Sequence, residues 1–406
     1  MSNLKTIYRD LADLIPASSR EGYDWDAFVE LIPALAAMEG ALGDAIYHAE
    51  GSVGVHTRMC LDAMMVDPLF EAGSVDDRFC LFMATLLHDA SKPDTEVVDP
   101  VTGRVGNPGH SKRGAVDARI LLWKAGVPFD LRERICALVE VHQAPFHAFA
   151  SRKGVDPVRL VRQLSWELSI PGLVSVARCD MIGREYVGKA ECLQDIQLFE
   201  QLAQEEGCWE GPCVFADDHT RTAYFRGAQL APEFALFKEP GSLVTVMAGL
   251  PATGKDTWVK AHRPGQPVVS FDDAKAELGL KHGENDGLAA HHAVDKAKVL
   301  LRKHEPFVWN STHLSKQMRD KTLDLLWAYG ARIEMVYLEQ PHDVVMRRND
   351  RRDSTLSNAG IERMLHRWEL PKITEVHSLA REVTVAPNQK LVHKSRPVTS
   401  VFERQR

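Results

Sequence analysis

Apolar positions in the first half of the chain recur at spacings of three and four residues. Examples are the segments FVELIPALAAMEGAL, RFCLFMATLLHDA and RERICALVEVHQ. This spacing places apolar side chains on one face of a helix, and β-branched alternation is rare in the same region. The pattern predicts an all-helical region over residues 1–186, and helices continue through the segment AECLQDIQLFEQLAQEEG.

The second half of the chain has a different pattern. Short β-rich runs are separated by helical stretches, and the runs are SLVTVMAGL, QPVVSFD, EPFVWNSTH and ARIEMVYLE. Such alternation is typical of a parallel sheet with crossover helices. We therefore predict a multi-domain fold in which an all-α helical bundle precedes an α/β domain with a central parallel sheet.

Glycine, proline and aromatic residues without a clear period separate the two patterns, in the segment GCWEGPCVFADDHTRTAYFRGAQLAPEFALFKEPG. Such residues favour turns and loops. We predict a helical domain over residues 1–186, a connecting module over 187–240, an α/β domain over 241–385 and a tail or edge element over 386–406.

Composition narrows the class of protein. The 406 residues are enough for two or three domains, and 45% hydrophobic with 26% charged residues is ordinary for a water-soluble protein. The start of the chain does not resemble a signal peptide, and no segment approaches the roughly 20 apolar residues of a membrane span. We therefore expect a cytoplasmic protein without membrane partners. The seven cysteines form no C-x-x-C pair and are interpreted as reduced core thiols.

The formal net charge of −7 argues against bulk attraction to a polyanion. Any contact with nucleic acid must then come from local basic patches, and the segment from Arg347 to Arg352 is one such patch.

The first candidate site is a set of histidines and aspartates in the helical region. His88 and Asp89 stand side by side in LLHDASKP, at the end of an apolar run. Alone, the pair is also explained by hydrogen bonding near a helix end. Four further residues lie on or at the start of predicted helices, namely His56, His110, His142 and Asp180. Imidazole and carboxylate together suit a transition-metal ion.

Two basic residues accompany this set. Lys92 follows the His-Asp pair, and Arg184 follows Asp180 by one helical turn. Either side chain can present a fixed positive charge to a substrate phosphate, and the alternative for both is a solvated helix face.

The order H…HD…H…H…D resembles the HD phosphohydrolase superfamily. The resemblance implies that His56, His88, Asp89 and Asp180 hold one metal, and that His110 and His142 complete a second metal site. Two such ions roughly 3.5–4 Å apart activate a water and stabilise the oxygens of a phosphoryl displacement. The metal can be Mn, Ni, Co, Cu or Zn.

The second candidate site is the segment GLPATGKDTW, which follows an apolar β-like run and precedes a helix. Gly249, Gly254 and Lys255 fit the pattern of a phosphate-binding P-loop, which indicates an ATP site with Mg²⁺. Asp256 stands where the pattern has a hydroxyl, and Thr257 follows it. Either the Asp256 carboxylate or the Thr257 hydroxyl binds the magnesium. A degenerate loop that binds nothing is the remaining alternative.

Residues downstream of the loop favour a kinase over a GTPase, since no guanine-reading N-K-x-D segment is present. Asp272 ends a predicted strand, which is the place for a base that accepts a hydroxyl proton. We expect Lys275, one turn further, to hold a phosphate of the acceptor. Arg348 and Arg352 share one face if the segment is helical, which suits a clamp on the transferred phosphoryl group. An exposed basic helix is the alternative.

This half resembles the kinase domain of the bacteriophage polynucleotide kinase family, through residues 249–258, Asp272 with Lys275, the segment NSTHL and the two arginines. The sequence departs from the family at Asp256, at Lys275 and at Ser311. The order of both motif sets, over about residues 45 to 385, resembles the HD-Pnk end-healing enzymes.

The HD-Pnk resemblance implies a bifunctional enzyme. Its helical half would remove 2′,3′-cyclic phosphate and 2′-phosphate ends, and its kinase half would phosphorylate 5′-hydroxyl ends of RNA or DNA with ATP. A ligase that joins the healed ends is the implied partner. Two alternatives stay open: a nucleotidase fused to a nucleoside or small-molecule kinase, and a nucleotide-gated binding or regulatory protein.

Overall fold

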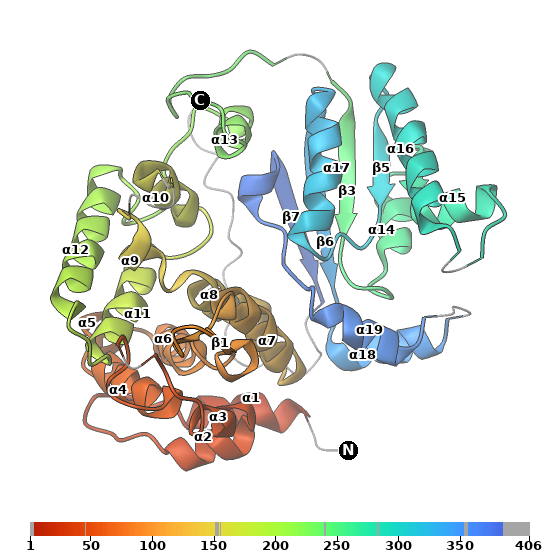
Figure 1. The fold of residues 1–406 in the computed structure, drawn as a ribbon. Helices are drawn as coiled ribbons and strands as arrows, with labels where there is room; N and C mark the ends of the chain where they lie inside the picture. The colour runs from red at the N-terminus through yellow and green to blue at the C-terminus, as the bar shows by residue number, and fades with distance from the viewer. Residues whose placement is uncertain are drawn as a thin grey trace.

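A computed structural model describes residues 4–384 except 45, 151–153, 155, 239–240, 282–283 and 353–355. The chain forms a helical part followed by an α/β part, drawn in red to green and in green to blue in Figure 1. This arrangement confirms the predicted fold class. The terminal segment 386–406 and Pro240 lie outside the described residues, so the predictions for them stay predictions.

The helical part contains two short strands among its helices. Its elements are α1 (Leu4–Asp13), α2 (Trp25–Leu31), α3 (Ala34–Met38), α4 (Val53–Met65), α5 (Pro68–Ala72), α6 (Val75–Leu87), the 3₁₀ helix η1 (Pro93–Thr95), β1 (Val97–Val98), β2 (Val105–Gly106), α7 (His110–Lys124), α8 (Phe129–Val141), α9 (Ala144–His147), α10 (Pro157–Ser165), α11 (Ile170–Ile182), α12 (Lys189–Glu205) and α13 (Asp218–Phe225).

Short polar residues define where the central helices begin. Ser52 Oγ accepts a hydrogen bond from a backbone N–H in the first turn of α4, and Ser169 does the same for α11. Ser74 and Asp77 form a reciprocal capping box at the start of α6. Each cap satisfies a backbone donor that has no partner within the helix.

The segment expected to connect the two halves takes part in the helical core. It forms α12 and α13, and Ile196, Phe199 and Tyr224 belong to the same buried cluster as the residues of α4, α6 and α11. The exact domain boundaries stay a prediction.

The α/β part follows the alternation seen in the sequence. Its elements are β3 (Leu243–Ala248), α14 (Lys255–His262), β4 (Val268–Ser270), α15 (Phe271–Glu277), α16 (Asp286–Arg302), β5 (Phe307–Asn310), α17 (Lys316–Ala328), β6 (Arg332–Glu339), α18 (His342–Asp350), α19 (Asn358–Leu365), the 3₁₀ helix η3 (Ile373–Glu375) and β7 (Ser378–Val383).

The five strands of this part form one parallel sheet in the order β4-β5-β3-β6-β7. Apolar residues of α16 and α17 pack on one face, and Val259 of α14 packs on the other. Both faces are thus covered, which explains why β3 and β5 are apolar runs rather than alternating ones. Parallel strands place their carboxyl ends, and the loops that follow, at one edge of the sheet.

The helical part and the sheet are in direct contact through α7 and α8. Arg132 of α8 forms a bidentate ion pair with Glu339 of β6, with both nitrogen-oxygen distances at 2.8 Å. Trp123 of α7 donates to the carbonyl oxygen of Gln340 at 3.1 Å and packs against Trp368. The two halves are therefore joined by buried contacts.

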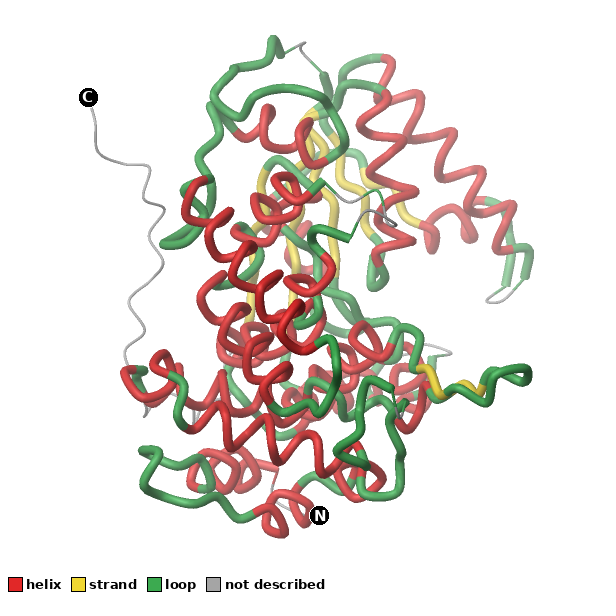
Figure 2. Tube along the Cα trace, turned by 60° about the vertical axis from the view of Figure 1, so that its left-hand side comes forward, coloured by secondary structure: helices red, strands yellow, loops and turns green. Residues whose placement is uncertain are grey.

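The antiparallel strands β1 and β2 form a hairpin that projects from the helical part, as Figure 2 shows in yellow. The seven cysteines are all free, and six of them are buried, as the sequence predicts. None of the helices in the described part of the chain has the length and apolar character needed to cross a bilayer.

Candidate active sites

The predicted metal ligands come from five helices and meet inside the helical part. His56 lies in the first turns of α4, His88 and Asp89 follow α6 directly, and His110 is the first residue of α7. His142 is the C-cap residue of α8, and Asp180 lies near the end of α11. All six are at most 8% exposed, and they are His56, His88, Asp89, His110, His142 and Asp180.

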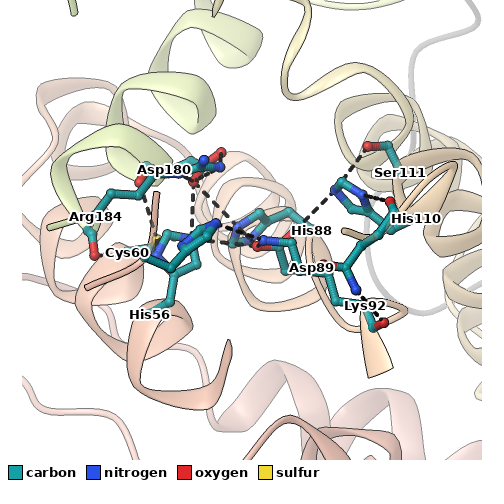
Figure 3. Close-up of polar contacts among 12 residues, drawn as sticks. His56, Cys60, His88, Asp89, Lys92, His110, Ser111, Asp180 and Arg184 are labelled. Carbon is teal, nitrogen blue, oxygen red and sulfur yellow. Dashed lines mark hydrogen bonds and ion pairs between the residues drawn. The ribbon is translucent and has the colours of Figure 1, made fainter. Parts of the chain in front are cut away.

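Figure 3 shows how closely these side chains approach one another. Asp89 Oδ2 lies 3.2 Å from His88 Nε2 and 3.6 Å from His56 Nε2. Asp89 Oδ1 lies on the other side, 3.3 Å from His110 Nε2 and 3.9 Å from His142 Nε2. The two oxygens of one carboxylate thus face two different pairs of histidines.

Asp180 completes the set of six candidate metal ligands. Its Oδ1 lies 3.1 Å from His56 Nε2 and 3.8 Å from His88 Nε2, and its Oδ2 lies 4.0 Å from His142 Nε2. Burial alone would raise the pKa of Asp180, but Arg184 and the neighbouring histidines outweigh it and lower that pKa well below its usual range. The carboxylate is therefore ionised at neutral pH.

Hydrogen bonds from the other ring nitrogen orient the histidines. The Nδ1 atoms of His88, His110 and His142 each bond the backbone carbonyl oxygen three residues earlier, at 2.7, 2.8 and 2.9 Å. His56 Nδ1 lies 2.9 Å from Glu50 Oε1. An Nδ1–H that is committed in this way leaves Nε2 with its lone pair free, which is the arrangement found in metal-binding histidines.

The donor set fits a metal ion. Among the described residues, His88 Nε2 and His142 Nε2 are buried without a hydrogen-bond partner. An unsatisfied buried nitrogen is costly, and a cation at this place would satisfy both. The donor atoms of His56, Cys60, His88 and Asp180 lie within 4.8 Å of one another, and so do those of His88, Asp89 and His142. Such nitrogen and oxygen donors suit a transition metal.

The two predicted positive charges belong to this cluster. Lys92 Nζ lies 2.7 Å from Asp89 Oδ2, and both side chains are buried. Arg184 donates to both oxygens of Asp180, at 2.8 and 2.9 Å, and its guanidinium lies over the ring of Phe146. Neither side chain is on a solvated helix face, and each neutralises part of the charge of one ligand carboxylate.

Three residues of the cluster were not singled out from the sequence. Cys60 Sγ lies 3.4 Å from His56 Nε2, one turn along α4. His48 bonds Glu50 through Nδ1 at 2.8 Å and Lys92 through Nε2 at 3.2 Å. His48 and Glu50 lie in an irregular segment, where no periodicity marks them, and the i, i+4 spacing of Cys60 from His56 was the available signal.

The second site lies where β3 ends. Gly249 has φ of 131° and Gly254 has φ of 102°, which L-residues rarely adopt, and a Cβ atom on Gly249 would lie 2.3 Å from the carbonyl oxygen of Leu338. Lys255 begins α14, and its Nζ donates to the carbonyl oxygens of Gly249 and Leu250 at 3.0 and 2.9 Å. The strand, glycine loop and helix of a P-loop are thus all present.

Comparison with known proteins agrees with this geometry. Residues 244–371 match the AAA domain family. The chain is also 30% identical over 128 residues to the multifunctional CCA protein of Halorhodospira halophila, and the match spans 32% of this chain and 28% of that protein.

Two solved structures are similar to parts of the chain. A putative kinase from Chloroflexus aurantiacus is 20% identical, with a TM-score of 0.31, and the match covers 36% of this chain and 88% of that one. A gluconokinase from Sinorhizobium meliloti is 20% identical, with a TM-score of 0.26, and the match covers 38% of this chain and 89% of that one.

In this α/β part, Asp256, which stands where a P-loop commonly has a hydroxyl, faces the neighbouring strand. Asp256 Oδ1 accepts a hydrogen bond from Asn310 Nδ2 at 2.6 Å, and Asn310 ends β5. The segment NSTHL that begins with Asn310 also supports the loop, because Gly249 N donates to the carbonyl oxygen of Thr312 at 2.9 Å.

The remaining predicted residues of the α/β part lie at or near the same edge of the sheet. Asp272 lies in the first turn of α15. Burial lowers the pKa of Lys255 to about 8, the charge of Arg352 lowers it further, and the charges of Asp256 and Asp272 oppose this shift. Arg348 Nη1 donates to the carbonyl oxygen of Thr253 in the loop at 3.4 Å.

Two placements differ from the sequence expectation. Helix α18 ends at Asp350, so Arg352 lies in the bend beyond it rather than on one helix face with Arg348. Arg351 is the C-cap residue of this helix, with φ of −90° and ψ of −5°. Lys275 Nζ is paired with Asp286 at 2.5 Å, so this lysine contacts the start of α16.

Proposed function

We propose that the protein is a bifunctional nucleic-acid end-healing enzyme. Its helical part hydrolyses 2′,3′-cyclic phosphate and 2′-phosphate ends, and its P-loop part transfers the γ-phosphate of ATP to 5′-hydroxyl ends of RNA or DNA. The observation that carries the proposal is that one chain holds both a buried, charge-balanced His/Asp cluster and a P-loop with an acidic residue and two arginines around its lysine.

The helical cluster is arranged for phosphoester hydrolysis. His56, His88, Asp89 and Asp180 would hold one ion, and His110 and His142 would complete a second site, since the Asp89 carboxylate faces both groups of imidazoles. Such ions supply an activated water and neutralise charge on the phosphoryl oxygens.

Two basic residues lie beside the candidate metal ligands and support this chemistry. Arg184 and Lys92 hold the two carboxylates in place and offset their charge. Each is close enough to the cluster to contact a phosphate that enters it, which is the role expected of both from the sequence.

The P-loop site is arranged for phosphoryl transfer. Backbone N–H groups at the start of α14 and the Lys255 ammonium would hold the ATP phosphates. Asp256, which faces Asn310 at the end of β5, would provide the carboxylate for Mg²⁺. Asp272, whose charge acts on Lys255, would accept the proton of the attacking hydroxyl. Arg348, bonded to the loop, and Arg352 would stabilise charge on the transferred group.

The two reactions suit one substrate. RNA cleavage that leaves a 2′,3′-cyclic phosphate also leaves a 5′-hydroxyl, so one enzyme with both activities restores both ends for a ligase. RNA or DNA ends are thus the proposed substrates, and a ligase in the same pathway is the proposed partner.

An oligonucleotide that carries a 5′-hydroxyl and a 2′,3′-cyclic phosphate tests both halves in one assay with labelled ATP and several divalent metals. Lys255→Ala is expected to abolish label transfer and keep hydrolysis. His88→Ala with Asp89→Ala is expected to do the reverse. Label transfer by Lys255→Ala would refute the kinase site, and transfer to mononucleosides in preference to the oligonucleotide would indicate a small-molecule kinase.

ATP turnover by the wild-type protein, with and without the oligonucleotide, separates catalysis from binding alone. Turnover that rises with oligonucleotide supports the kinase. An absence of turnover in both conditions, together with tight ATP binding, would indicate a regulatory nucleotide site.

A further inference from the structure

Beside the buried His/Asp cluster, three segments bring two tyrosines and an arginine together. Tyr47 lies in the irregular segment before α4, Tyr186 follows α11, and Arg104 comes from the β1–β2 hairpin. The two ring centroids are 5.3 Å apart with 51° between the ring planes, and Arg104 Cζ lies 5.4 Å from the centroid of Tyr47. We call these three residues the aromatic rim.

Backbone and side-chain bonds join the aromatic rim to the cluster. His48, the residue after Tyr47, contacts Lys92 at 3.2 Å. On the other side, the N–H of Glu185 donates to Glu50 Oε2 at 2.9 Å, and Glu50 also holds His56 at 2.9 Å. The ring of His48 also lies 4.9 Å from that of His56, and Arg184, two residues before Tyr186, donates to Asp180 at 2.8 Å. Each tyrosine therefore lies within two residues of a side chain that contacts a candidate metal ligand.

The hairpin is attached at the same place. Arg104 Nε donates to Asp44 Oδ2 at 2.9 Å, which fixes the guanidinium near Tyr47. Asn107, just after β2, donates to the carbonyl oxygen of Lys92 at 2.9 Å. The hairpin thus projects from the cluster itself, and its arginine is held at the rim.

The aromatic rim is open to solvent although the cluster is not. Tyr47 is 41% exposed and the Arg104 side chain 46% exposed, whereas Asp89 and His142 are fully buried. Gly188 has room only for a hydrogen, because a Cβ there would lie 2.1 Å from the Tyr186 hydroxyl oxygen. The position of Tyr186 thus depends on a glycine.

We propose that the aromatic rim stacks the base of the nucleotide whose phosphate enters the cluster. The inference rests on the hydrolase half of the proposed function and names the part of the substrate that is bound outside the metal site. Nucleobases stack on tyrosine rings and guanidinium planes with little regard to sequence. A positive charge at the rim also suits the phosphate backbone of the same substrate.

The test compares a substrate with a base to one without. The expected result for Tyr47→Ala and for Tyr186→Ala is a roughly 10-fold fall in the ratio of kcat/KM for a 2′,3′-cyclic phosphate oligonucleotide to kcat/KM for bis(p-nitrophenyl) phosphate. Tyr47→Trp should keep the ratio, because the stacking face is kept. Val187→Ala, at a fully exposed neighbour, is the matched control. A ratio unchanged in both alanine variants would overturn the inference.

An absence of hydrolysis with both substrates would refute the hydrolase proposal. A binding measurement then still tests the stacking inference. An oligonucleotide with 2-aminopurine at its 3′ end is titrated with the wild-type protein without added metal. Fluorescence quenching that is lost in Tyr47→Ala supports stacking, and equal quenching by both proteins contradicts it. A 2′,3′-cyclic mononucleotide and the oligonucleotide then show whether one base or a longer strand is held.

Discussion

At the scale of single residues, Asp256 and Asn310 form an unusual pair. A P-loop commonly has a serine or threonine directly after its lysine, and the hydroxyl of that residue binds magnesium. An acidic residue at the end of another strand also holds the ion. Here the carboxylate stands in the first turn of α14 and an amide ends β5, and the two are bonded at 2.6 Å. The pair keeps one carboxylate at the same edge of the sheet, and we propose that this carboxylate replaces the usual hydroxyl in binding magnesium.

Mg²⁺ is expected to increase the affinity for ATP less in Asp256→Ala than in the wild-type protein, by a factor of about 10 or more, because the carboxylate proposed to bind the ion is lost. Binding of ATP without Mg²⁺ should change little. Titration of a fluorescent ATP analogue with and without Mg²⁺ measures both. Thr257→Ala is the matched variant, and a larger loss of Mg²⁺ dependence in Thr257→Ala would assign the ligand to the hydroxyl.

The second residue-scale prediction concerns pH. Burial lowers the pKa of Lys255 to about 8, and only the protonated amine attracts phosphate. Above pH 8 the free loop must therefore take up a proton to bind ATP, so affinity should fall roughly fivefold between pH 8 and 9 and change less below pH 7. Calorimetric titration of ATP across this range measures the effect. Lys255→Arg should remove the slope, and an equal slope in that variant would assign it to another group.

Some site residues could be predicted from the sequence and others could not. His88 directly follows α6 and Asp180 lies in α11, two helices whose apolar runs are visible in the sequence, and the order of these residues along the chain indicates a common site. His48, Glu50 and Tyr47 lie in a short irregular segment that is held by long-range bonds, such as that from Glu185 to Glu50. Local sequence carries no signal for such bonds.

At the scale of elements, helix ends position much of the metal cluster. His88 and His142 directly follow α6 and α8, and His110 begins α7. In each of the three, Nδ1 reaches a carbonyl oxygen three residues earlier. Periodicity predicts that these helices exist. The residue at which a helix ends is harder to predict, and Arg352 lies beyond the end of α18.

The contact between α8 and β6 gives a stability prediction. Arg132 and Glu339 are buried, and Tyr337 donates to the same carboxylate at 2.6 Å. Arg132→Ala would leave that carboxylate buried without its cation and should lower the free energy of unfolding by about 3–5 kcal/mol. Urea unfolding measures the change.

An exposed ion pair provides the control. Lys316 and Asp320 are paired at 2.6 Å with side chains that are 57% and 42% exposed. Lys316→Ala should change stability by less than about 1 kcal/mol, because such pairs are solvated. Equal losses for Lys316→Ala and Arg132→Ala would contradict the assignment of a structural role to the buried pair.

At the scale of the whole molecule, helix α7 connects the two sites. It begins at His110 in the metal cluster, and Trp123 near its other end bonds the carbonyl oxygen of Gln340, just before α18 and its arginines. Together with the Arg132–Glu339 pair, these contacts lead us to expect that the two halves unfold together. A buried interface of this kind restricts the relative motion of two domains.

Calorimetry tests this coupling. We expect a single thermal transition for the wild-type protein and an increase in its Tm with MgATP, since a ligand that binds only the native state stabilises everything that unfolds with its site. Lys255→Ala should lose the increase and keep the single transition. Arg132→Ala should lower the Tm of the single transition and keep the increase with MgATP, because its P-loop is unchanged. Two transitions in the wild-type protein, of which MgATP shifts only one, would show that the helical part and the α/β part are energetically independent despite their contacts.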